Sequence, residues 1–225
     1  MREEEGIRAG SQRRQLMKTE KVGGVENLER AMSGVFGPVK ITGKLSRVLA
    51  YAAVKSTVSY QEIKEIIEDD PEDVLLLADQ WRLLLPVSTA KSSSWEDRLL
   101  LLKDGQIYEI PNVVRYLVQD GIHSGRWDPE KAIVKLFKEL GDQDWKRIPA
   151  LVRGIAGEAV NHTVTGNQIR MICLRLGVGN RVDGLIAELK AAGIISPRLS
   201  SIPEVIREGS PIYELNQSVA LVKSP

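Results

Sequence analysis

Apolar residues recur with helical spacing along most of this chain, and the clearest example follows Val164. Four of them stand at positions i, i+3, i+4 and i+7, which places them on one buried face of a helix. These four are Ile169, Ile172, Cys173 and Leu176. Thr165 and Gln168 have the spacing of a capping box, so the helix is predicted to begin there. Gly177 is a plausible left-handed residue at its end.

A second helix is predicted after the tight turn at Val178-Gly179, with Asn180 as its N-cap. Its apolar residues repeat the same spacing and are Val182, Leu185, Ile186 and Leu189. Gly193 follows this helix. Ile194-Ile195 and residues 212–215 then have the character of two short strands around a polar loop. The pattern over residues 163–215 therefore predicts a helix, a turn, a helix and a two-stranded wing.

This order of elements resembles the winged helix-turn-helix superfamily of prokaryotic regulators. Besides the order, the resemblance is carried by Leu176-Gly177-Val178 in the turn and by residues 187–195, which read AELKAAGII. It concerns a fold superfamily and no single protein. The resemblance implies a fold, but neither a ligand nor a target.

The same pattern occurs earlier in the chain. Ser59 and Glu62 form a second potential capping box, preceded by Val58 as Thr165 is by Val164. The apolar residues Ile63, Ile66 and Ile67 then match Ile169, Ile172 and Cys173. Asp70 and Pro71 are placed to cap and start a further helix, whose apolar face is Val74, Leu77, Ala78 and Trp81. We interpret this match as an internal duplication.

Strands and additional helices complete both copies. In the first copy, Asp104-Gly105 is the expected centre of a hairpin between residues 98–102 and 107–110, after a strand near residues 84–87. The periodicity predicts a preceding helix over about residues 43–55, and the equivalent helix of the second copy falls within residues 144–160, with Pro149 in its first turn. Two linking helices are predicted between the copies: one over residues 111–120, stopped by Gly121, and one from Asp128-Pro129 to Gly141 with Leu140 on its buried face.

The predicted fold class is mainly α with small β-hairpins (α+β), arranged as two winged-helix domains in tandem joined by linking helices. Residues 1–40 are predicted to be a charged N-terminal tail with a possible short helix. The first domain covers residues 41–110, the linking helices residues 111–143, and the second domain residues 144–216. Residues 217–225 are predicted to be a C-terminal tail.

Composition excludes several classes of protein. The chain is 43% hydrophobic and 27% charged, with a net charge of +1, as expected of a soluble globular protein without a global field for nucleic acid. No apolar run approaches the ~18 residues of a membrane span, and we expect a cytoplasmic location. Two histidines and one cysteine lack metal-ligand spacing, and Cys173 is expected to be a buried thiol. With no catalytic, cofactor or metal motif, the chain is not expected to be an enzyme.

The two copies differ in the sign of their net charge. Residues 56–82 hold two basic and eight acidic residues, a net −6, whereas residues 163–199 hold five basic and two acidic residues, a net +3. Because DNA is a dense array of negative charge, only the second copy is expected to approach it. The candidate DNA-contacting residues are Asn167, Arg170, Arg175, Asn180, Arg181, Gly184, Lys190 and Arg198. Arg181 is expected near a base edge or phosphate, and Arg198 on the wing near the backbone.

Two functions remain open at this point. The first is a sequence-specific DNA-binding protein, a transcriptional regulator, that binds double-stranded DNA through the second copy and uses the acidic first copy for assembly. The alternative is a tandem winged-helix subunit of a larger complex that contacts proteins and not DNA. In either case a protein partner or self-association is expected through the first domain or the linking helices.

Overall fold

The computed structural model describes residues 22–36, 40–87, 94–198 and 209–220 of the 225-residue chain. The described part is α+β, as predicted, with helices around two small antiparallel three-stranded sheets, in which the strands at residues 57–59 and 163–165 were not predicted. Its first half contains α2 (Val22–Phe36), α3 (Lys40–Lys55), β1 (Thr57–Ser59), α4 (Tyr60–Ile67), α5 (Pro71–Gln80), β2 (Leu85–Pro86) and β3 (Ile107–Glu109). Two further helices follow, α6 (Asn112–Ser124) and α7 (Pro129–Glu139). Its second half contains α8 (Ile148–Glu158), β4 (Thr163–Thr165), α9 (Gly166–Arg175), the 3₁₀ turn η1 (Gly179–Arg181), α10 (Val182–Ala191), β5 (Ile195–Pro197) and β6 (Ile212–Leu215).

The same succession of elements occurs twice, from α3 to β3 (the first unit) and from α8 to β6 (the second unit). In each, a helix and a short strand precede two helices, and two more strands follow. The last strand lies in the middle of each sheet, in the orders β1-β3-β2 and β4-β6-β5. Val58 pairs with Tyr108 in the first sheet, and Val164 with Tyr213 in the second. Ile63 and Ile169 are fully buried in equivalent helices, so the predicted repeat of element order is confirmed.

Both predicted capping boxes are present. The Ser59 Oγ accepts a hydrogen bond from the Glu62 N–H at 3.2 Å, and the Glu62 carboxylate accepts one from the Ser59 N–H at 2.8 Å. Thr165 and Gln168 make the same two bonds, also at 3.2 and 2.8 Å. Each box supplies partners for backbone donors that the first turn of a helix otherwise leaves unpaired.

The first capping box gives a testable pH dependence. Hydrogen bonds from Lys55 and Tyr51 hold the pKa of Glu62 at about 2, below its ordinary value of 4.5. Because the folded-state pKa is lowered, this stabilisation is complete above pH 4.5 and is lost as the pH falls from about 4.5 to about 2. We expect Glu62→Gln to flatten the slope of unfolding free energy over that range, measured by urea denaturation.

The second unit provides a matched control for this prediction, because Gln168 occupies the equivalent position and carries no titratable group. Gln168→Ala is expected to lower stability by about 0.5–2 kcal/mol, as loss of a cap does, without changing the pH slope. If the unfolding free energy of Glu62→Gln fell with pH as steeply as that of the wild type, other carboxylates would be responsible for the pH dependence.

The linking helix α6 is longer than predicted. It continues through Gly121 and ends at Gly125, whose φ is +67°. Gly121 does not stop the helix; a Cβ at this position would lie 2.9 Å from Leu28 Cδ1, so glycine allows α2 to pack closely on α6. Leu28 and Met32 are fully buried, so α2 is part of the core, while residues 1–21 lie outside the described part.

The predicted hairpin of the first unit was wrong in one strand. β3 pairs with β1 on one side and with β2 on the other, so neither of its edges is free for residues 98–102. That segment lies outside the strands, where the Leu101 carbonyl accepts a hydrogen bond from the Tyr108 hydroxyl. Asp104-Gly105 does form a turn, with Gly105 at φ +86°.

Several local predictions are also corrected. Asp70 occupies the N-cap position of α5, but its carboxylate binds the Lys44 ammonium at 2.8 Å and caps nothing. Asn180 lies within η1, and α10 begins only at Val182. Leu140 is 62% exposed because α7 ends at Glu139. Ser218 and Val219 are buried, so the predicted C-terminal tail is packed at least as far as residue 219.

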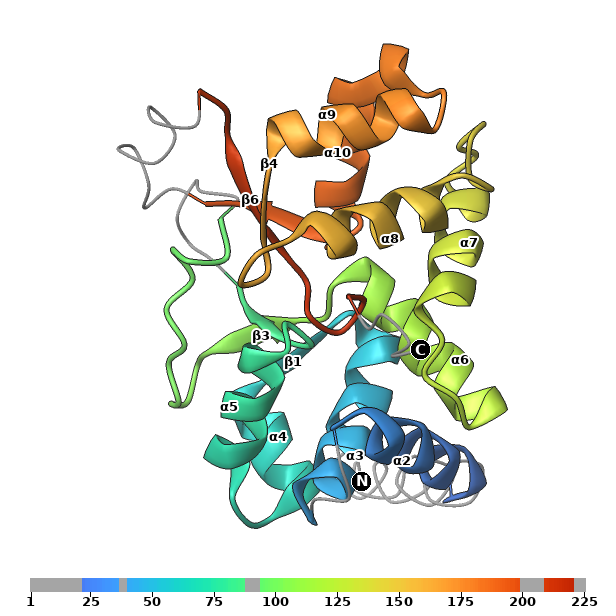
Figure 1. Cartoon of the computed structure of the whole chain (residues 1–225). Helices are drawn as coiled ribbons and strands as arrows, with labels where there is room; N and C mark the ends of the chain where they lie inside the picture. The colour runs from blue at the N-terminus through green and yellow to red at the C-terminus, as the bar shows by residue number, and fades with distance from the viewer. Residues whose placement is uncertain (1–21, 37–39, 88–93, 199–208, 221–225) are drawn as a thin grey trace, which may run out of the picture.

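The two units contact each other directly. Arg82 of the first unit binds Glu214 of β6 at 2.8 Å. The Asn216 side-chain amide donates to the Arg82 and Gly193 carbonyls at 3.1 and 3.0 Å. The backbone N–H of Trp95 donates to the Ser196 hydroxyl at 2.9 Å. As Figure 1 shows, the second unit lies above the first, with α6 and α7 along one side.

Candidate partner-binding surface

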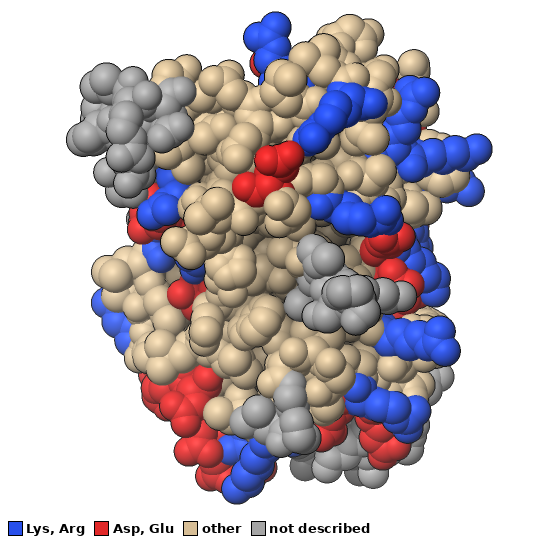
Figure 2. All heavy atoms as spheres, viewed as in Figure 1, with Lys and Arg blue, Asp and Glu red and all other residues tan. Residues whose placement is uncertain are grey.

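Basic and acidic side chains are unevenly distributed over the surface. Figure 2 shows Lys and Arg over the upper right of one face, and Asp and Glu at its lower left, the region of α4 and α5 in Figure 1. On α5 the exposed side chains include Glu72, Asp73 and the apolar Leu76. The charge difference inferred from the sequence is therefore a difference between two surfaces.

Arg181, predicted to contact DNA, binds three carboxylates of its own chain. Its guanidinium lies 2.7 Å from Asp142, 2.8 Å from Asp144 and 3.1 Å from Glu188. Asp142 is only 3% exposed at its side chain. These carboxylates occupy the place where a phosphate or base would have to bind, so we leave Arg181 out of the candidate surface.

The pKa shifts in this cluster follow from the same geometry. Hydrogen bonds to Asp142 and Asp144 raise the pKa of Arg181. Burial works to raise the pKa of Asp142, but the bonds from Arg181 and Glu188 outweigh it and leave this pKa lowered. Burial and the neighbouring Asp142 raise the pKa of Glu188. The cluster therefore depends on the positive charge of Arg181 to keep three close carboxylates together.

We expect Arg181→Ala to destabilise the fold by about 1–3 kcal/mol, because it leaves Asp142 buried without its cation. The measurement is chemical denaturation at neutral pH. The difference in unfolding free energy between the wild type and the variant should become smaller near pH 4, where the carboxylates take up protons. Arg153→Ala, which removes an exposed guanidinium paired with the exposed Glu130, is the control and should cost less than about 1 kcal/mol. Equal losses in the two variants would contradict this account.

Two more predicted contacts are also paired within the chain. Arg175 binds Glu158 at 2.9 Å, and Arg198 binds Glu96 of the first unit at 2.5 Å. The Arg198 contact ties the beginning of the wing to the first unit. The C-terminal end of α10 is held as well, because the Val113 N–H of α6 donates to the Ala192 carbonyl at 2.9 Å.

The remaining predicted site residues lie on the surface of the second unit. Asn167, Arg170, Asn180, Gly184 and Lys190 are exposed. Within the described part of the chain, no carboxylate pairs with Arg170 or Lys190. A Cβ at Gly184 would meet no heavy atom within 4 Å. Of the predicted cations, these two alone are left uncompensated, which is a small set for holding a phosphate backbone.

An apolar pair that was not predicted as part of a site lies in the middle of this surface. Met171 and Leu174 are 56% and 53% exposed on α9. They belong to an exposed stripe with helical spacing, here called the α9 stripe: Asn167, Arg170, Met171, Leu174 and Arg175. The signal was present in the sequence, since the stripe follows the same i, i+3, i+4, i+7 spacing as the buried face of α9.

The described residues were also compared with what a metal site, a reactive histidine or cysteine and a membrane-spanning helix require. Among them, no group of three or more His, Cys, Asp and Glu side chains is arranged to hold a metal ion. His123 lies in α6, not in a loop, and its Nδ1 lies 2.6 Å from the Gln119 carbonyl oxygen. Cys173 is fully buried, and burial raises the pKa of its thiol. None of the described helices is long and apolar enough to cross a membrane.

Comparison with known proteins gives one match. A protein-family model matches residues 31–224, a span that includes α3 to β6 and therefore both units. No curated protein and no solved structure matches the chain.

Proposed function

The chain belongs to the family whose model matches residues 31–224, and we propose that its members are tandem winged-helix proteins that act as protein-interaction subunits. The order of helices and strands and the central position of the last strand in each sheet support the winged-helix assignment. The single, buried cysteine is compatible with the cytoplasmic location expected above.

The α9 stripe is the proposed binding surface, and its exposed Met171 and Leu174 are the main support. An apolar pair with helical spacing suits the face of a partner helix, which buries such residues in a shared groove. Arg170, which pairs with no described carboxylate, lies beside the pair, and a cation in that position favours a partner with acidic residues beside its own apolar ones. Helix α10 is the second helix of the helix-turn-helix, which in a DNA-binding winged helix would enter the groove. It is less suited to that role here, because Arg181 before it binds Asp142 and the Ala192 carbonyl after it accepts a hydrogen bond from Val113.

We propose that the first partner is a second copy of this chain. The exposed face of α5 has the required chemistry, with Leu76 beside Glu72 and Asp73. The helices α9 and α5 lie at opposite ends of the molecule in Figure 1, so α9 of one copy would meet α5 of the next. Such a heterologous contact builds a chain of copies or a closed ring.

Sedimentation velocity over a range of concentrations tests this proposal. We expect the wild-type chain to show species larger than a monomer, and the double variant Met171→Glu, Leu174→Glu to remain monomeric. Val54→Glu is the matched control, since Val54 is 75% exposed but lies on α3 outside the stripe. A monomeric wild-type chain at every concentration, or a double variant that associates as strongly as the wild type, would refute it.

DNA binding is the second candidate, favoured by the exposed, unpaired Arg170 and Lys190. If it holds, the double variant Arg170→Ala, Lys190→Ala should weaken binding to a duplex in a mobility-shift assay at ~50 mM salt and lower the salt slope by about two. Lys64→Ala in the acidic first unit is the control and should have little effect. Absence of a shift by the wild-type protein at this salt concentration excludes the DNA-binding candidate.

A further inference from the structure

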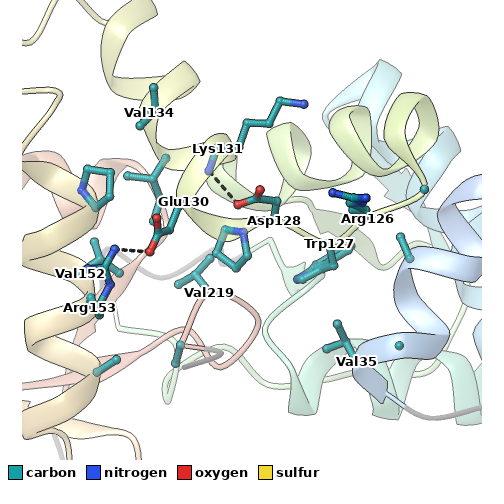
Figure 3. A pocket seen from close by; sticks show the side chains of 18 of the residues that line it. Val35, Arg126, Trp127, Asp128, Glu130, Lys131, Val134, Val152, Arg153 and Val219 are labelled. Carbon is teal, nitrogen blue, oxygen red and sulfur yellow. Dashed lines mark hydrogen bonds and ion pairs between the residues drawn. The ribbon is translucent and has the colours of Figure 1, made fainter. Parts of the chain in front are cut away.

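A cavity of about 970 Å³ lies between the two halves of the chain and is separate from the α9 stripe. Its walls come from α2, the connection between α6 and α7, the helices α7 and α8, and residues Val219 and Ala220. Figure 3 shows Trp127 and Val35 on one side of it and Val152 and Arg153 on the other. Its volume is within the range of small-molecule sites, roughly 300–1,000 Å³.

Much of the cavity wall is apolar. Val35, Val134, Val152 and Val219 line it together with the indole of Trp127. The indole is fixed in place, because its N–H donates to the Ser218 carbonyl at 3.0 Å and Phe36 packs edge-on against its ring. A rigid aromatic and aliphatic wall of this kind favours the apolar body of a ligand.

Most charged side chains around the cavity are already paired. Arg153 pairs with Glu130, and Lys131 pairs with Asp120. The Asp128 carboxylate accepts a hydrogen bond from the Lys131 N–H at 3.0 Å and caps α7. Glu130 is therefore paired with a cation, whereas Asp128 is bonded to a backbone N–H and keeps its negative charge.

Two guanidinium groups remain, those of Arg30 and Arg126. Neither has a carboxylate partner among the described residues. Both residues line the cavity, Arg30 from α2 and Arg126 from the connection between α6 and α7. A Cβ built on Gly125, the neighbour of Arg126, would lie 3.8 Å from the Arg30 Nη1. Two unpaired guanidinium groups beside an apolar wall are suited to a carboxylate, sulfonate or phosphate on an apolar body.

We infer that this cavity is a binding site for a small organic anion. Its acidic group binds Arg30 and Arg126, and its apolar part lies against Trp127, Val152 and Val219. Because α2 packs on the first unit and α8 begins the second, such a ligand contacts both halves of the chain. The site is independent of the proposed function, and it remains if the α9 stripe binds nothing.

The fluorescent anion 8-anilinonaphthalene-1-sulfonate is the probe, and the uncharged N-phenyl-1-naphthylamine is its matched control. We expect the wild-type chain to bind one equivalent of the sulfonate. The double variant Arg30→Glu, Arg126→Glu should raise its dissociation constant about tenfold or more while leaving binding of the uncharged probe unchanged. Val152→Trp, which fills the cavity, should abolish binding of both. Circular dichroism confirms that each variant is folded.

Several results would overturn this inference. Sulfonate binding that is insensitive to both the arginine variant and Val152→Trp would place the probe elsewhere. A chain ending at Ala220 that binds the probe at least tenfold more tightly than the full chain would identify residues 221–225 as the natural occupant. Pelleting with phosphatidylglycerol vesicles that Arg30→Glu, Arg126→Glu abolishes would assign the arginines to a lipid surface.

Discussion

Leu185→Ala is expected to lower the free energy of unfolding by about 2–5 kcal/mol, as loss of a fully buried leucine does. Leu185 projects from α10 into the core and is 0% exposed. Its removal costs the transfer free energy of the missing methyl groups and leaves a cavity that a well-packed core closes only partly. The measurement is urea denaturation of the wild-type chain and the variant.

Leu174→Ala is the control for this prediction. Leu174 lies on the neighbouring helix α9 but is 53% exposed, so its removal should cost less than about 1 kcal/mol. A loss below about half a kcal/mol for Leu185→Ala would place this side chain on the surface. The assignment of α10 faces, on which the position of Lys190 also depends, would then be incorrect.

Gly193→Ala is expected to destabilise the chain by about 2–4 kcal/mol for two separate reasons. Gly193 has a φ of +74°, a backbone conformation that L-residues adopt only at a cost. A Cβ at this position would also lie 2.6 Å from the Pro111 Cβ, well inside normal contact. Pro111 precedes α6, so the substitution should disturb the packing of the second unit on the first as well as the end of α10.

Gly177→Ala separates these two contributions. Gly177 follows α9 as Gly193 follows α10, and its φ is +71°, but a Cβ there would meet nothing within 4 Å. The control should therefore lose only the backbone contribution, about 1 kcal/mol. Thermal denaturation of both variants provides the comparison. Equal losses of stability in Gly193→Ala and Gly177→Ala would show that the close approach to Pro111 does not affect stability.

Local signals predicted much of this fold. The capping residues Ser59 and Thr165 were identified because helix starts depend on side chains that are near in sequence. The apolar spacing found the buried faces of α9 and α10, including Leu185 and Ile169. The repeat of the pattern at Ser59 and Thr165 then predicted two similar units, and the structure confirms the repeated order of elements.

Contacts between distant segments explain what the sequence did not reveal. Arg181 was predicted to contact DNA, but its guanidinium binds Asp142 and Asp144, which lie 39 and 37 residues away, as well as the nearer Glu188. Gly121 was interpreted as a helix end because its close contact with α2 is a tertiary feature. The exposed pair Met171 and Leu174 was not singled out, because the predictions for α9 considered the apolar residues of its buried face and the charged residues of its outer face.

One measurement tests the central claim, that the second unit binds protein and not DNA. The wild-type chain is mixed with a fluorescein-labelled duplex at ~50 mM salt, where phosphate contacts are screened least, and sedimentation velocity is followed at separate wavelengths for protein and dye. We predict a protein boundary that sediments faster than a monomer and a duplex boundary unchanged from that of duplex alone. A duplex that sediments with the protein, and is released by Arg170→Ala, Lys190→Ala, would contradict it.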